Sequence, residues 1–105
     1  MTFIARGANL EAIRAHGMRV LYPDREDVAK GVRAFSDYES AGTFDVVIVT
    51  LKAHQLAAIA PRLEALCDED TVVMPLQNGI PFWYFNDHGG EHSGRAVESV
   101  DPGGV

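Results

Sequence analysis

The feature that most constrains this chain is an unbroken run of β-branched residues near its middle. Residues 46–49 read Val-Val-Ile-Val, and two further residues lead from them into Lys52. A run that is apolar on both faces is typical of a strand inside a parallel sheet, with helices covering both sides. Ligands of such open α/β sheets bind just beyond the carboxyl ends of the strands. Lys52 is therefore a candidate ligand contact, and the alternative is a lysine that ends a strand and points into water.

A second run of the same kind follows about twenty residues later. Residues 71–76 read TVVMPL and lead into Gln77, Asn78 and Gly79. Because parallel strands end at the same edge of a sheet, Asn78 is expected near Lys52. The alternative is that Asn78 is a turn residue, since Asn-Gly is a common turn pair.

The segment between the two runs has the pattern of a helix. Four leucine and isoleucine residues recur at helical spacing over residues 56–66, and Pro61 is expected to kink this helix or to start a second one. His54 and Gln55 would lie in its first turn, where imidazole and amide donors beside Lys52 suit a phosphate, a ribose or a carboxylate. A surface or capping histidine is the alternative for His54.

The N-terminal part predicts half of a mononucleotide-binding unit. Residues 2–5 form a short apolar run, Arg6 follows it, and Asn9 can cap a helix that stops at Gly17. Strand, turn and helix in this order are typical of dinucleotide-binding folds, although no G-x-G-x-x-G occurs in the 105 residues. An arginine at such a strand end accommodates a 2′-phosphate, with about 1.5–3 kcal/mol per charged hydrogen bond. An exposed surface arginine is the alternative.

An antiparallel appendage is expected next in the chain. Residues 18–22 and 28–34 alternate between apolar and polar side chains, and the turn-forming residues 23–26 lie between them. This pattern predicts a β-hairpin at the edge of the sheet. Residues 36–43 are polar and are expected to form a loop or a single helical turn.

Two further chemical patterns are interpreted as structural. His88, Glu91 and His92 match the H-x-x-E-H zinc motif, but the Gly-Gly pair between them opposes the required helix by about 1 kcal/mol per glycine. The match is interpreted as accidental, and no metal site is expected. Cys67 has no thiolate-stabilising partner in the sequence and is interpreted as inert packing.

Composition narrows the class of protein. A length of 105 residues allows one domain at most, and residues 85–105 form an irregular tail without periodicity. The net charge of −6 argues against nucleic acid as a partner. A single cysteine excludes an internal disulfide, and no apolar run has the length of a membrane span. The expectation is an acidic, soluble, cytoplasmic α/β protein.

Three segments carry a family resemblance. FIARGANLEAIRAHGMRV (residues 3–20), VVIVTLKAHQ (46–55) and VVMPLQNGIPFWYF (72–85) resemble the ketopantoate reductase (2-dehydropantoate 2-reductase) family in order and spacing. The resemblance implies an NADP-binding Rossmann domain with a doubly wound, mostly parallel sheet. It also implies an oxidoreductase that uses NADPH to reduce a 2-keto acid to a 2-hydroxy acid in pantothenate biosynthesis.

The resemblance also implies roles for individual residues. Arg6 matches the arginine that binds the 2′-phosphate of NADPH, and Lys52 and Gln55 match residues beside its ribose and phosphates. Asn78 matches the asparagine near the nicotinamide ribose and the substrate. Lys52 and Asn78 are thus candidates for orienting substrate and nicotinamide, and no catalytic residue is expected within these 105 residues.

The sequence departs from the family at both ends. The family begins with a strand and a G-x-G-x-x-G turn, and a helical C-terminal domain supplies its general acid; neither is present here. Residues 1–105 are therefore expected to form an incomplete Rossmann-like domain that lacks the first strand and the Gly-rich turn. We expect weak or absent NADPH binding, and no activity of the chain on its own.

The missing first strand would lie between the strands at Ile4 and Ile48 in a sheet of order 3-2-1-4-5. Its absence leaves unpaired strand edges, which recruit other chains, so a homo-oligomer is expected. Two alternatives stay open. One is a non-catalytic α/β module that self-associates through these edges, and the other is a Rossmann reductase of another keto or hydroxy acid.

Overall fold

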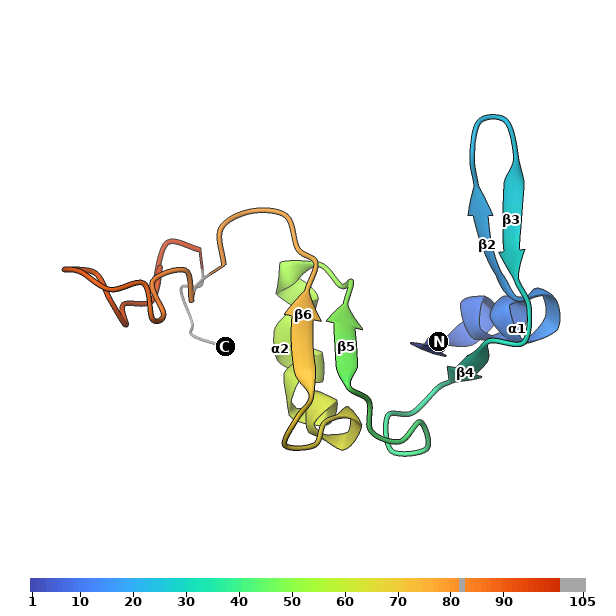
Figure 1. Cartoon of the computed structure of the whole chain (residues 1–105), viewed down its shortest axis with the longest axis horizontal. Helices are drawn as coiled ribbons and strands as arrows, with labels where there is room; N and C mark the ends of the chain where they lie inside the picture. Colours follow the sequence, from blue (N-terminus) through green and yellow to red (C-terminus); the bar gives the residue numbers. More distant parts are fainter. Residues whose placement is uncertain (82, 101–105) are drawn as a thin grey trace. The chain divides into compact units, whose positions relative to one another are not determined.

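The structure is a computed structural model that describes residues 1–81 and 83–100. The chain divides into two compact units: one contains Met1–Val47 and Arg62–Val72, and the other contains Ile48–Pro61 and the described residues from Val73 onward. The elements in chain order are β1 (Thr2–Ile4), α1 (Gly7–His16), β2 (Met18–Leu21), β3 (Glu26–Ala29), β4 (Arg33–Phe35), β5 (Val46–Val49), α2 (Ala53–Leu63), the 3-10 helix η1 (Glu64–Leu66) and β6 (Val72–Pro75) (Figure 1).

The strands pair in twos. β1 pairs with β4 in parallel, β2 pairs with β3 antiparallel, and β5 pairs with β6. The arrows of β5 and β6 point the same way (Figure 1). The α/β class and the parallel pairs are confirmed. The expectation of one mostly parallel sheet is not met in the described part of the chain, because each strand there has a single hydrogen-bonded neighbour.

In the first unit, α1 packs against β4. Leu10 and Ile13, one turn apart on α1, are buried together with Ala34 of β4. The helix ends at Gly17 as predicted, where the backbone N–H donates to the carbonyl of Ile13. The predicted cap at Asn9 is wrong. α1 begins at Gly7 and Asn9 lies inside its first turn, because the extended backbone of the preceding residue leads straight into the helix.

The hairpin is confirmed, but its second strand is shorter than predicted. β3 ends at Ala29, and the left-handed backbone of Gly31 (φ 71°) then redirects the chain. Residues Arg33–Phe35 form the separate strand β4, with Ile4 opposite Phe35 in the parallel register. The prediction of a single strand over residues 28–34 is therefore wrong. The exposed alternating residues are part of the hairpin, whereas Ala34 is buried against α1.

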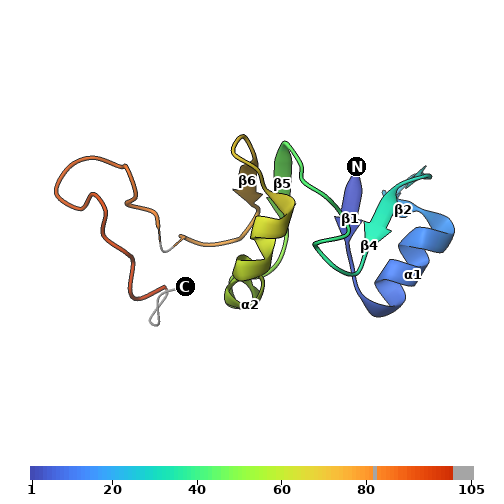
Figure 2. The same ribbon diagram turned by 90° about the horizontal axis from the view of Figure 1, so that it is seen from below.

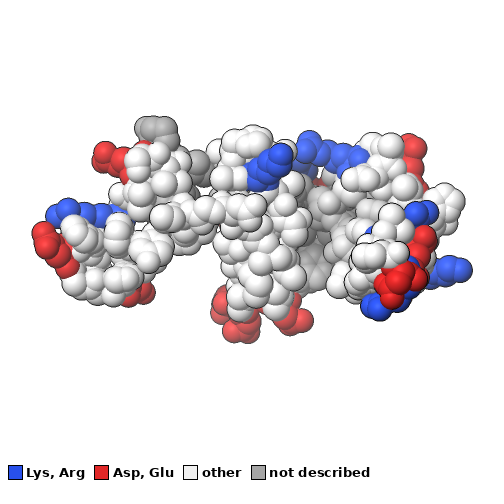
Figure 3. Space-filling model, turned by 90° about the horizontal axis from the view of Figure 1, so that it is seen from above, with Lys and Arg blue, Asp and Glu red and all other residues white. Residues whose placement is uncertain are grey.

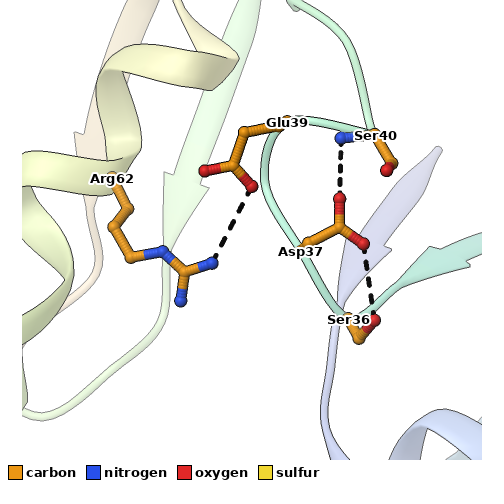
Figure 4. A network of polar contacts seen from close by, with 5 residues as sticks. All are labelled: Ser36, Asp37, Glu39, Ser40 and Arg62. Atoms are coloured by element: carbon orange, nitrogen blue, oxygen red, sulfur yellow. Dashed lines mark hydrogen bonds and ion pairs between the residues drawn. The ribbon is translucent and has the colours of Figure 1, made fainter.

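The polar segment between β4 and β5 is a turn held by hydrogen bonds (Figure 4). The Asp37 carboxylate accepts a hydrogen bond from the Ser40 backbone N–H at 2.8 Å. Hydrogen bonds from the Ser40 hydroxyl and backbone lower the pKa of Asp37 below its ordinary value. Arg62 lies at the end of α2, and its guanidinium nitrogen is 3.9 Å from a carboxylate oxygen of Glu39. The Arg62 Cζ lies over the Tyr38 ring, 4.5 Å from the ring centroid. The loop predicted for residues 36–43 therefore contacts the end of α2 through Glu39 and Tyr38.

The central strand β5 is buried on one face only. Val47 and Val49 are 7% and 5% exposed, whereas Val46 and Ile48 are 50% and 53% exposed. α2 covers one face of the β5–β6 pair (Figures 1 and 2). The prediction of helices on both sides of this strand is wrong for the described residues, because α1 packs on β4 and no other helix follows β6 there.

α2 runs through Pro61, and the 3-10 turn η1 replaces the second helix that was considered. The thiol of Cys67 donates to the carbonyl of Leu63 at 3.2 Å. Residues 83–100 form turns without a helix or strand, and residues 101–105 of the predicted irregular tail lie outside the described residues. The helices within residues 1–81 and 83–100 are all too short or too polar to cross a membrane.

Candidate functional site

Two loops meet at the carboxyl ends of β5 and β6. The Leu76 backbone N–H donates to the carbonyl of Val49 at 2.9 Å, which continues the ladder to the ends of the strands. The Gln77 side-chain amide donates to the carbonyl of Leu51 at 3.3 Å and joins the two loops just beyond the ladder. Parallel strands therefore deliver their following polar residues to one sheet edge, as the sequence predicts.

Lys52 and Gln55 lie at the start of α2 and are joined by two hydrogen bonds. The Gln55 backbone N–H donates to the Lys52 carbonyl at 2.9 Å, and the Lys52 backbone N–H donates to the Gln55 side-chain oxygen at 3.1 Å. This return contact from the third helical residue is the glutamine half of a capping box. The sequence reading missed the capping role, which the three-residue spacing could have revealed. The Gln55 amide nitrogen stays available as a donor, and the Lys52 ammonium has no ion-pair or hydrogen-bond partner among the described residues.

Asn78 borders a pocket in the second unit. The pocket has a volume of about 720 Å³, and Asn78 lines it together with His54 of α2 and Trp83 of the following segment. Its remaining walls come from the first turns of α2, from the segment that begins at Pro75, and from Val100. Lys52 and Gln55 lie outside the lining, although both are adjacent to it in sequence. The sequence reading missed Trp83, for which the aromatic run after residue 79 was the available signal.

The turn at Asn78 depends on the glycine that follows. Gly79 has φ 96°, a backbone conformation that side chains disfavour, and no atom lies near the position of a Cβ there. Asn78 is therefore both a turn residue and a pocket residue. Its carboxamide forms no hydrogen bond with the described part of the chain.

Arg6 lies in the other unit. It lies two residues after the end of β1 and forms the N-cap position of α1, with an extended backbone and an exposed side chain. Its guanidinium has no ion pair or hydrogen bond within residues 1–81 and 83–100. The structure thus brings Lys52, Gln55 and Asn78 to one sheet edge, and it places Arg6 only with respect to the first unit.

Charged side chains form small separate groups of both signs on the face drawn in Figure 3, with wide uncharged surface between them.

The residues of the zinc-like motif lie in turns rather than on a helix. Gly89 and Gly90 have φ values of 74° and 79°, so His88 and His92 do not share a helical face. His92 instead contacts the Phe85 ring, at 5.5 Å between ring centroids. In the described ranges, no three metal-binding side chains are grouped.

Comparison with known proteins decides the family. Residues 1–81 match the family described as ketopantoate reductase PanE/ApbA. The chain belongs to this family. A 2-dehydropantoate 2-reductase from Mesorhizobium japonicum is 41% identical over all 105 residues, and the chain spans 32% of its length. The resemblance inferred from the three sequence segments is confirmed.

Two solved structures match the fold. A Ralstonia solanacearum MolK2 protein assigned as a ketopantoate reductase is 36% identical with a TM-score of 0.84, over 98% of this chain and 32% of that one. A D-mandelate dehydrogenase solved with NADH and anilino(oxo)acetate is 30% identical with a TM-score of 0.62, over 75% of this chain and 26% of that one. The chain therefore spans about a third of the length of these family relatives.

Proposed function

We propose that this chain is the cofactor-binding part of an NADPH-dependent 2-dehydropantoate 2-reductase. The observation that carries the proposal is the shared sheet edge: Lys52, Gln55 and Asn78 follow two adjacent parallel strands in a chain of the ketopantoate reductase family. Ligands of open α/β sheets bind at this edge. The Mesorhizobium japonicum relative is about three times as long as this chain.

The exposed polar groups fit a phosphate-rich dinucleotide. The Arg6 guanidinium suits the 2′-phosphate that distinguishes NADPH from NADH, because its planar fork matches phosphate geometry. The Lys52 ammonium suits the backbone phosphates, and the Gln55 amide nitrogen suits a ribose or phosphate oxygen. These groups have no competing acid partner in the described residues.

When bound, the nicotinamide supplies a hydride for the keto carbon of the substrate. Asn78, with Lys52 nearby at the same edge, would hold the keto acid and the nicotinamide ribose in the orientation for this transfer. The keto oxygen then takes up a proton to give the 2-hydroxy acid. The resemblance assigns that proton donor to a helical second domain outside these 105 residues.

We propose further that residues 1–105 form a partial Rossmann domain. The strands of the dinucleotide fold pair here as β1–β4 and β5–β6, and the 105 residues contain no Gly-rich turn. That turn and the helix after it hold the pyrophosphate, so their contribution to affinity is lost. NADPH binding by this chain is therefore expected to be weak, and turnover is not expected.

Titration of NADPH and NADH against the chain tests the cofactor assignment. Amide chemical shifts detect weak binding, and Arg33→Ala is a matched control because Arg33 is an exposed arginine at the amino end of a strand. One charged hydrogen bond is worth about 1.5–3 kcal/mol, so Arg6→Ala should weaken NADPH binding about ten- to hundredfold and leave NADH unchanged. Equal loss with Arg33→Ala, or no loss with Arg6→Ala, would contradict the assignment.

A second candidate function is self-association through unpaired strand edges. The β4 edge is partly closed to another chain, because Arg14 donates to the carbonyl of Ala34 at 3.0 Å and occupies this backbone acceptor. β1 and β5 each pair on one side only among the described strands. Such edges template pairing with another chain. Sedimentation equilibrium tests this candidate: a tight dimer without nucleotide affinity would favour it over the reductase, and a monomer would remove it.

A third candidate keeps the fold and changes the substrate. The D-mandelate dehydrogenase neighbour was solved with anilino(oxo)acetate, an aromatic oxo acid, and matches three quarters of this chain. Reduction of another keto acid would then replace reduction of 2-dehydropantoate. Titration of each keto acid against the chain, followed by amide chemical shifts, distinguishes the two.

A further inference from the structure

The pocket beside Asn78 has the size and walls of a small-molecule site. Its volume of about 720 Å³ falls within the range that ligand pockets occupy. Apolar groups form most of the walls, and the half-buried Trp83, Leu56 of α2 and Ile80 of the loop are among the lining residues. An aromatic wall of this kind favours flat apolar ligands through stacked or edge contacts.

Three polar side chains line the same pocket. The Gln77 amide nitrogen is held by the carbonyl of Leu51, so this carboxamide has a fixed orientation. The Asn78 carboxamide and the His54 ring form no hydrogen bond with the described protein groups. Apolar walls with a few available polar groups suit a ligand with an apolar body and a polar head.

We infer that this pocket receives the side chain of the keto acid and selects for bulky apolar, especially aromatic, side chains. The inference rests on the proposed function, which makes Asn78 a residue that orients the keto acid. Because Asn78 and Trp83 line the same pocket, the side chain of a substrate held by Asn78 would occupy a space that Trp83 borders. Trp83 is thereby a specificity-determining residue, since a small side chain leaves the indole without a ligand contact.

Binding of two 2-keto acids to the chain tests the inference. Pyruvate carries a methyl group and benzoylformate carries a phenyl ring next to the same keto-acid head. Discrimination by an apolar pocket reaches about tenfold for a single methylene, so benzoylformate should bind at least about tenfold tighter than pyruvate. Amide shifts should cluster around His54, Asn78 and Trp83, and fluorescence of the single tryptophan should change in parallel.

Two neighbouring alanines of α2 supply a matched pair of variants. Ala57 lines the pocket and Ala58 does not, and both are exposed on the same helix. Ala57→Leu should weaken benzoylformate about tenfold with little effect on pyruvate, whereas Ala58→Leu should change neither. Trp83→Leu is the second variant, and it should abolish the preference for the phenyl ring whether or not Ala57→Leu folds.

Equal affinity for the two keto acids, shifts outside the pocket, or equal effects of the two alanine variants would overturn the inference. The cofactor proposal fails separately. NADPH binding that Arg6→Ala leaves unchanged, with benzoylformate shifts at the pocket, would refute the cofactor proposal and support the pocket assignment. NADPH binding that depends on Arg6, without benzoylformate shifts, would refute the pocket assignment alone.

Discussion

Replacement of Gly17 by alanine should destabilise the first unit more than any other glycine replacement there. Gly17 has φ 83° and ψ −178°, and an ideal Cβ would lie 2.4 Å from the Ala29 carbonyl oxygen and 3.1 Å from its carbon. The backbone conformation alone costs a non-glycine residue about 1–3 kcal/mol. Ala29 is paired with Met18 in the hairpin ladder, so the oxygen can move only with the hairpin. That displacement adds about 1–3 kcal/mol.

The two terms give a loss of about 2–6 kcal/mol for Gly17→Ala, reduced by about 0.4–1 kcal/mol because alanine restricts the unfolded chain. Gly31→Ala is the control, since Gly31 also has a positive φ of 71° but no atom within 4 Å of a Cβ. Urea unfolding followed by far-ultraviolet circular dichroism measures both. A loss for Gly17→Ala no larger than that for Gly31→Ala would refute the steric argument and leave only the backbone term.

Three other predictions concern hydrogen bonds. Gln55→Ala should lower the free energy of unfolding by about 0.5–1 kcal/mol, because the cap is lost. Gln55→Glu should keep a capping oxygen but weaken NADPH binding. Equal destabilisation by the two variants would contradict the capping role. Thr71→Val should cost about 0.5–1.5 kcal/mol, because the Thr71 hydroxyl donates to the Phe44 carbonyl at 2.7 Å; Thr71→Ser should retain most of the stability. Since the pKa of Asp37 is lowered on folding, its contribution to stability should be full above its ordinary pKa of 3.8 and be lost as pH falls through the folded-state pKa. Ser40→Ala should raise that pKa toward the ordinary value in a carboxyl NMR titration, and an unchanged pKa would refute the assigned cause.

The elements that sequence predicted well are those whose patterns are local. The β-branched run of β5, the helical spacing of α2 and the second run of β6 each mark one element without help from distant residues. The strand-end position of Lys52 and Asn78 follows from these elements alone, because parallel strands share a carboxyl edge. The same locality explains why three short segments were sufficient to identify the family.

The elements that sequence misplaced depend on contacts between distant residues. Residues 28–34 alternate throughout, and nothing local shows that Gly31 turns the chain away from the hairpin toward β1. α1 begins at Gly7, after the extended backbone of Arg6, and its buried residue Leu10 packs with Ala34 of β4. Local propensity cannot report either effect, because the partner strand lies tens of residues away.

The sequence predicted which residue types lie at the site, but not the residues that they contact. The glutamine at position 55 was singled out as a ligand donor, yet its oxygen is committed to the Lys52 backbone. Sequence order also gave no sign that Trp83 and His54 line one pocket, because the loop after β6 brings them together from about thirty residues apart. Such three-dimensional proximity requires knowledge of the turn at Gly79, whose φ is 96°.

The two faces of β5 give the sharpest test of the interpretation from sequence. Val46 is 50% exposed and Val47 is 7% exposed, although they are neighbours in one strand. Valine to threonine keeps the shape and adds a hydroxyl, which costs about 1–3 kcal/mol where it is buried without a partner. Val47→Thr should therefore lower the unfolding free energy by that amount. Val46→Thr should change it by less than about 0.5 kcal/mol, as exposed substitutions do. Equal losses in urea unfolding would mean that both faces of the strand are covered in solution, as the unbroken apolar run predicts, and that the exposed face described here is occupied by another chain.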